Sequence, residues 1–166
     1  MPDVSTEVAI ATTTLGSAAT TLDLTSIPST YTDLRLVFVG TESTAGFNYV
    51  NLRFNSDTGS NYSATFLQGS GTAASSGRLT STTRIRLDEW GLSNTIPSLC
   101  TVDIFSYAGS TYKSLLVSAS EDYNGSGLTS VRVGLWRSTA AITSINLVNL
   151  SSNFAIGTTA TLYGIL

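Results

Sequence analysis

The chain has 166 residues, of which 42% are hydrophobic and only 11% are charged, and its formal net charge is −3. This length fits one domain with its own core, and the hydrophobic content excludes a disordered chain. A weak acidic charge with scattered arginines gives no electrostatic footprint for nucleic acid.

β-Strands are the element that the pattern predicts from one end of the chain to the other. After a short polar arm at Met1–Glu7, alternating or Thr-rich apolar stretches predict strands at Val8–Thr14, Thr20–Thr25, Asp33–Gly40, Tyr49–Asn55, Ser63–Gln68, Arg84–Leu87, Ser98–Tyr107, Lys113–Ser120, Thr129–Trp136, Ile142–Asn149 and Thr158–Leu166. Turn residues such as Pro28 and Ala108-Gly109-Ser110 separate them. No window shows helical periodicity over three turns.

The strand Asp33–Gly40 has two different faces. Leu34, Leu36 and Phe38 fall on one side and should point into the core, because successive side chains alternate. The other face carries Val37 and Val39, so we expect it to be partly covered as well.

The stretch Tyr49–Ser63 joins a strand to a polar turn. Val50, Leu52 and Phe54 should be buried, with Arg53 on the opposite face. In the turn Asn55–Asn61 we expect Gly59 to supply a positive φ, and an Asx-rich turn is favoured over a calcium loop because the closing acidic ligand is missing.

Gly69–Thr83 is rich in Gly, Ser, Thr and Ala and has little pattern. We expect a mobile surface loop here, and the alternative is a loop ordered by a neighbouring subunit.

These elements predict an all-β fold: an antiparallel β-sandwich, with a jelly roll as the leading topology. Residues 1–24 hold the N-terminal arm and the first β segments, and residues 25–166 hold the sandwich, all within a single domain.

Catalytic chemistry finds little support in the sequence. There is no histidine, which removes the commonest general base and the common zinc sites. The carboxylate pairs Asp88-Glu89 and Glu121-Asp122 are neighbours along the chain and are poorly placed for a glycosidase. Cys100 lies in an apolar segment and should be a small buried residue. We therefore expect no enzyme, no catalytic residue, no metal and no cofactor.

Exposed aromatic residues could stack on sugars or contact another subunit. The candidates are Trp90, Tyr112, Tyr123 and Trp136. We favour core or subunit-interface positions over sugar binding for these residues and for Tyr107. The arginines at positions 84, 86, 132 and 137 should be solvated or pair with carboxylates across a sheet.

Neither a secretory signal nor an apolar run of the roughly 18 residues that span a bilayer is found. We expect a soluble protein without a membrane partner.

Three stretches resemble a known group. Ser29–Val37, Leu52–Ser63 and Val133–Ile145, together with the ending Leu162–Leu166, are similar to small β-structural virion proteins of tailed bacteriophages. The similarity covers most of residues 25–166, and these motifs define no catalytic or ligand residue.

This resemblance implies a virion component that is either a capsid decoration (cement) protein or a domain of a head or tail fibre. We expect decoration, because no shaft or coiled coil precedes the domain; the chain would form a homotrimer on the capsid surface, bound to the major capsid protein. The alternative is a fibre domain that binds a receptor or a glycan of the host surface, and a secreted enzyme is a distant third.

Overall fold

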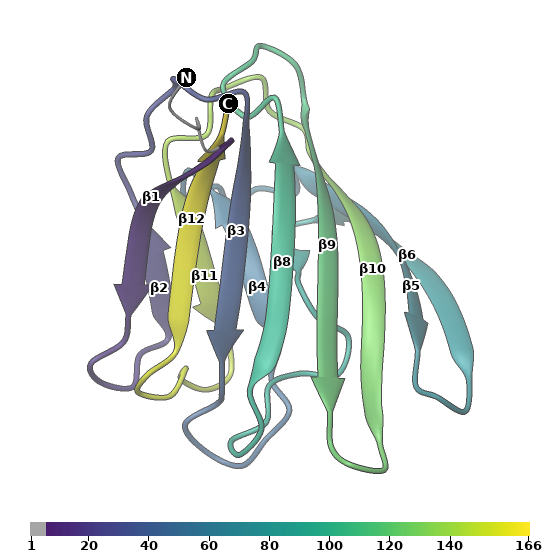
Figure 1. The fold of residues 1–166 in the computed structure, drawn as a ribbon. Helices are drawn as coiled ribbons and strands as arrows, with labels where there is room; N and C mark the ends of the chain where they lie inside the picture. The colour runs from purple at the N-terminus through teal and green to yellow at the C-terminus, as the bar shows by residue number, and fades with distance from the viewer. Residues whose placement is uncertain (1–5) are drawn as a thin grey trace.

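Two antiparallel sheets pack face to face in the computed structural model, which describes residues 6–166 (Figure 1). The larger sheet has eight strands in the order β1-β12-β3-β8-β9-β10-β5-β6. Their bounds are Glu7–Thr14 (β1), Asp33–Gly40 (β3), Tyr62–Gly69 (β5), Ala74–Thr82 (β6), Ser98–Phe105 (β8), Lys113–Asp122 (β9), Gly127–Trp136 (β10) and Thr159–Ile165 (β12).

The smaller sheet has four strands in the order β2-β11-β4-β7. It consists of Thr21–Leu24 (β2), Val50–Phe54 (β4), Ile85–Arg86 (β7) and Ile145–Asn149 (β11). The described residues contain no helix, so the prediction of an all-β antiparallel sandwich is confirmed.

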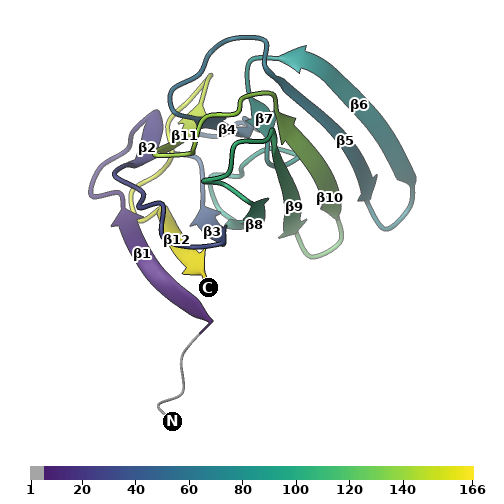
Figure 2. The ribbon, with the colours of Figure 1, turned by 90° about the horizontal axis from the view of Figure 1, so that it is seen from above.

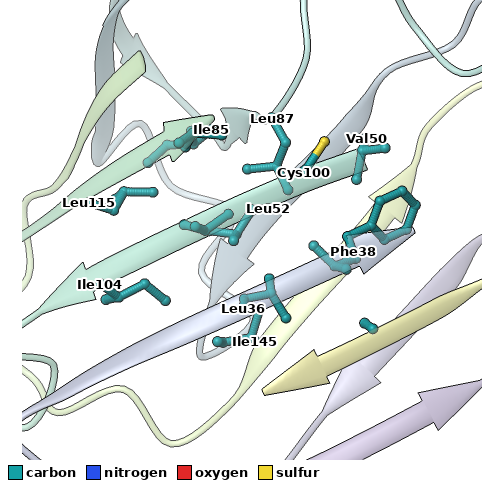
Figure 3. Close-up of a cluster of buried hydrophobic side chains, with 14 of the residues drawn as sticks. Leu36, Phe38, Val50, Leu52, Ile85, Leu87, Cys100, Ile104, Leu115 and Ile145 are labelled. Carbon is teal, nitrogen blue, oxygen red and sulfur yellow. The ribbon is translucent and has the colours of Figure 1, made fainter. Parts of the chain in front are cut away.

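The core lies between the two sheets and follows the alternation of the sequence (Figure 3). Leu34, Leu36 and Phe38 are fully buried, as predicted for β3, whereas Val39 on the outer face is 41% exposed. Leu52 and Phe54 of β4 are also fully buried. Cys100 is buried in the same core, and burial raises the pKa of its thiol well above the ordinary value, as predicted for a structural cysteine.

Asp57 organises the turn after β4. Its carboxylate accepts the amide of Gly59 at 2.8 Å, the side chain of Asn61 at 2.9 Å and the indole N–H of Trp136 at 2.7 Å. Burial alone would raise the pKa of Asp57, but these three hydrogen bonds outweigh it and lower the pKa. This carboxylate therefore fixes the turn to the end of β10.

The left-handed residues of this turn are Asn55 (φ 51°) and Ser56 (φ 56°), and Gly59 is not among them, so that prediction was wrong. The Asn55 side chain explains the difference, because its oxygen accepts the amides of Thr143 at 2.9 Å and Ser144 at 3.1 Å. Asn tolerates the left-handed region, and the chain turns at the two residues that directly follow β4 instead of at the glycine.

The segment predicted as a loop at Gly69–Thr83 is largely strand β6, and that prediction was also wrong. β6 pairs with β5 from Gly69↔Ala74 to Tyr62↔Thr82. An extra residue near the end of β6 shifts the register, and Ser81 there has φ 51°. Figure 2 shows this hairpin curving away from the other strands at one side of the molecule.

β1 and β2 are edge strands, one in each sheet. The arm predicted at Met1–Glu7 lies mostly outside the described residues, and Glu7 itself begins β1.

Candidate functional site

Three aromatic side chains from three loops form a cluster at one end of the sandwich. Phe47 comes from the β3–β4 connection, Trp90 from the β7–β8 connection and Tyr123 from the β9–β10 turn. The ring of Tyr123 lies 6.5 Å from that of Phe47 and 6.4 Å from that of Trp90. Phe47 is 59% exposed and Trp90 37% exposed, so the aromatic cluster presents ring surface to solvent.

Backbone packing brings two of these loops together. Gly91 has φ 97°, and a Cβ on it would come within 2.6 Å of the carbonyl carbon of Phe47. The amide of Leu92 donates to the carbonyl of Asn48 at 2.9 Å. Only glycine permits both this φ and this approach, so Gly91 places Trp90 beside the Phe47 loop.

A buried carboxylate holds Tyr123 in place. The Tyr123 hydroxyl donates to Glu121 at 2.9 Å, and the Ser98 hydroxyl donates to the other oxygen of Glu121 at 2.6 Å. Burial raises the pKa of Glu121, although both hydrogen bonds oppose the rise. Burial and the bond to Glu121 both raise the pKa of Tyr123. The phenol therefore remains a neutral hydrogen-bond donor at neutral pH.

Asp88 lies behind this end of the sandwich and is 2% exposed. One of its oxygens accepts the amide of Val50 at 3.0 Å, and the other is buried without a hydrogen bond among the described residues. Burial raises the pKa of Asp88 to about 7; the Val50 amide opposes this rise, and the charge of Glu121 adds to it.

Arg132 of β10 links the larger sheet to β7 and to the β7–β8 connection. It is 2% exposed, it forms an ion pair with Glu89, and it donates to the backbone carbonyl of Arg86. Its guanidinium lies 5.1 Å from the ring centroid of Phe66. Burial and the nearby Arg86 lower the pKa of Arg132 to about 10, so it stays charged at neutral pH.

Glu89 also forms an ion pair with Arg86, with 3.3 Å between Oε2 and Nη1. The guanidinium of Arg86 lies 3.7 Å from the ring centroid of Tyr49. The prediction that these arginines pair with carboxylates thus describes Arg86 and Arg132, whereas Arg137 lies exposed and donates to the backbone of Ser60.

The predicted aromatic residues separate into three places. Trp90 and Tyr123 meet, whereas Tyr112 is 56% exposed just before the first residue of β9, at the opposite end of a strand about 30 Å long. Trp136 is 2% exposed and packs in the core, with its ring 5.4 Å from that of Phe54 and 6.3 Å from that of Tyr62. A sugar cannot reach that ring.

Phe47 was missed by the sequence reasoning, because the loop that carries it has no periodicity. A large aromatic residue between Gly46 and Asn48, outside any strand pattern, was the available signal.

A second surface feature covers the outer face of the eight-stranded sheet. Five apolar side chains that are 41–61% exposed define what we call the outer apolar face: Val39, Leu67, Leu99, Val131 and Val133. Val39 lies opposite Leu99, and Val131 lies opposite Leu67, so their side chains are cross-strand neighbours. These five side chains remain about half exposed in the structure of residues 6–166, and Arg35 on the same side of β3 forms ion pairs with Glu7 and Asp103.

In residues 6–166 no group of three or more His, Cys, Asp or Glu side chains could hold a metal ion. No helix in the same residues is long and apolar enough to cross a membrane. Comparison with known proteins found no matching family model, no matching curated protein and no matching solved structure.

Proposed function

We propose that this chain is a structural protein that assembles with itself and acts as a trimeric capsid decoration protein on the outside of a phage head. The observation that carries the proposal is the outer apolar face. The resemblance of the sequence motifs to small virion proteins supplies the biological setting.

The physical argument starts from the composition of this face. Aliphatic side chains that remain about half exposed lose contact with water when a second surface covers them, and this burial favours association. Only 11% of all residues are charged, and Arg35, the charged side chain of β3 on this face, is already paired with Glu7 and Asp103. Closed symmetric assemblies are the usual outcome for such self-association.

The oligomeric state tests this proposal. Analytical ultracentrifugation at micromolar concentration should show a species of three chain masses, and Val133→Lys should reduce it to one. Thr139→Lys, an exposed change in the β10–β11 connection, is the matched control and should leave the trimer intact. A wild-type chain that sediments only as a monomer overturns self-association.

The decoration role has its own test. Particles that lack the chain should rupture at a lower temperature than complete particles, and added purified protein should restore the difference. Particles whose rupture temperature is the same with and without the protein overturn the decoration role.

A second candidate function is recognition of a surface glycan by a fibre domain, and the aromatic cluster favours it. Exposed rings held by Gly91 and Glu121 can stack on the apolar face of a sugar. On an array of immobilised polysaccharides, the wild-type protein should then bind, Trp90→Ala should lose binding, and Tyr112→Ala should retain it. Absence of binding by the wild type rejects this candidate.

A further inference from the structure

Three arginines gather on the outer face of the four-stranded sheet. In the pairing of β4 with β7, Asn51 lies opposite Arg86 and Leu52 opposite Ile85. The same register continued by one residue places Arg84 opposite Arg53. Like charges directly opposite each other destabilise a sheet, so this arrangement is unfavourable in the isolated chain.

Carboxylates of the described residues do not balance this charge. Arg86 shares Glu89 with the buried Arg132, and within residues 6–166 neither Arg53 nor Arg84 forms an ion pair. Burial lowers the pKa of Arg84, and the charges of Arg53 and Arg86 lower it further. An anion from outside would relieve this repulsion.

Hydrogen bonds made by one side of each guanidinium hold the side chains of Arg53 and Arg84 in position. Arg53 donates through Nε to the carbonyl of Thr83 at 3.2 Å. Arg84 donates through Nε to Asn51 at 3.0 Å and through Nη1 to the Thr83 hydroxyl at 3.3 Å. These bonds leave terminal N–H groups for a carboxylate, which guanidinium binds in a planar, bidentate geometry.

A hollow of about 280 Å³ lies beside these arginines. We call it the arginine hollow, and it is lined by Leu79, Ser81, Thr82, Thr83, Arg84 and Arg86. The extra residue in β6 and the left-handed Ser81 turn the chain from one sheet towards the other, which brings the end of β6 next to the arginines.

β6 is also an edge strand. Its nine residues pair with β5 on one side, and the other side has no strand in the eight-stranded order. It contains no proline and a single charge, Arg78, so it lacks most of the features by which edge strands resist pairing. An edge of this kind can accept an extended peptide as an additional strand.

We propose that the free edge of β6 and the arginine hollow together bind an extended acidic segment of a partner protein. The backbone of the segment pairs with β6, and its carboxylates bind Arg53, Arg84 and Arg86. The inference uses residues outside both the outer apolar face and the aromatic cluster, so it can hold or fail independently of the proposed function.

Fluorescence anisotropy with labelled, end-capped ten-residue peptides tests this site. A peptide of alternating threonine and glutamate should bind the full chain, and its glutamine counterpart should bind at least tenfold more weakly. A peptide in which proline replaces each threonine keeps the charge, but its prolines cannot donate to the edge of β6. Its affinity should therefore also be at least tenfold lower.

Arginine variants locate the site. Arg84→Gln and Arg53→Gln should each weaken binding of the glutamate peptide about tenfold. An unchanged melting temperature of each variant is the check on folding. Arg35→Gln is the matched control, since it removes the same charge from β3 in the other sheet, and it should leave affinity within about twofold.

Any one of the following results overturns the proposal: no binding of the glutamate peptide, equal binding of the glutamate and proline peptides, or an equal loss of affinity in Arg35→Gln and Arg84→Gln. A uronic acid oligosaccharide of equal charge that binds as tightly as the peptide also overturns it, because the site would then recognise charge without strand pairing.

Discussion

Phe54 is the side chain at which the turn after β4, the end of β10 and the core meet. Its ring is fully buried and lies 5.4 Å from that of Trp136 and 6.5 Å from that of Tyr62. The Tyr62 hydroxyl in turn accepts the backbone amide of Phe54 at 3.0 Å. Loss of this ring would leave a cavity between the two sheets.

Phe54→Ala should therefore lower the free energy of unfolding by about 3–5 kcal/mol, through lost transfer energy and the cavity. Arg53→Ala, on the outer face of the same strand, should change it by no more than about 0.5 kcal/mol. Urea unfolding of both variants measures the difference. Equal stability of the two variants would show that the faces of β4 are assigned wrongly.

Asp88 gives the fold a pH dependence of defined sign. Its pKa is about 7 in the folded chain against an ordinary 3.8, so the folded state holds the proton more tightly. Stability should then fall as the pH rises from about 4 to about 7, by at most about 1.4 kcal/mol per pH unit, and level off above that. The raised pKa of the neighbouring Glu121 acts in the same direction, while the charge of Arg132 opposes the shift.

Unfolding titrations between pH 4.5 and 8 measure this slope. Asp88→Asn should flatten the slope. The control Asp122→Asn changes the exposed last residue of β9, whose side chain accepts the amide of Asn124, and it should leave the slope as in the wild type. A wild-type stability that increases with pH over this range would contradict the burial of Asp88 as a neutral acid.

At the scale of the element, β6 shows where local pattern fails. Its sequence Ala74–Thr82 is mostly small residues, and only Leu79 could signal a buried face. The strand forms because β5 supplies the pairing partner, and the ring of Phe66 covers the space above Gly77, where a Cβ would come within 2.7 Å of that ring. This cross-strand contact is absent from any single window of sequence.

Gly77→Val should therefore loosen the β5–β6 hairpin despite the higher strand propensity of valine, because the added side chain displaces Phe66. Amide hydrogen exchange should show protection in β6 reduced about tenfold or more. Ser76→Val, the neighbouring change on the other face, should leave protection unchanged or increased. Equal protection in both variants would rule out the Phe66 contact as the cause.

Strongly alternating elements, by contrast, were predictable from the sequence. β3 and β4 each present one apolar face, and alternation alone places Leu36 and Leu52 in the core. The candidate site was only half predictable: Trp90 and Tyr123 stood out as aromatic residues, but their meeting with Phe47 depends on three loops. The burial of Arg132 could not be foreseen either, because its partner Glu89 lies more than 40 residues away in the chain.

At the scale of the whole molecule, a buried ion pair joins β10 of the larger sheet to Glu89 in the β7–β8 connection, in addition to the apolar packing between the sheets. Arg132→Met would leave the Glu89 carboxylate in the interior with only the half-buried Arg86, and it should cost about 3–5 kcal/mol. The double variant Arg132→Met/Glu89→Gln removes both charges and should recover a large part of that loss. A double-mutant cycle by urea unfolding measures the coupling, and additive losses would contradict it.

The pairing of β1 with β12 fixes both ends of the described chain at one pole of the sandwich. The amide of Leu166 there donates to the carbonyl of Thr6 at 3.1 Å, at the same end as the start of β9 (Figure 1). The aromatic cluster occupies the other end, beyond the last residue of β9. A tether attached at either Thr6 or Leu166 would thus emerge from the pole remote from Trp90, and a chain anchored in this way would hold its aromatic rings outward.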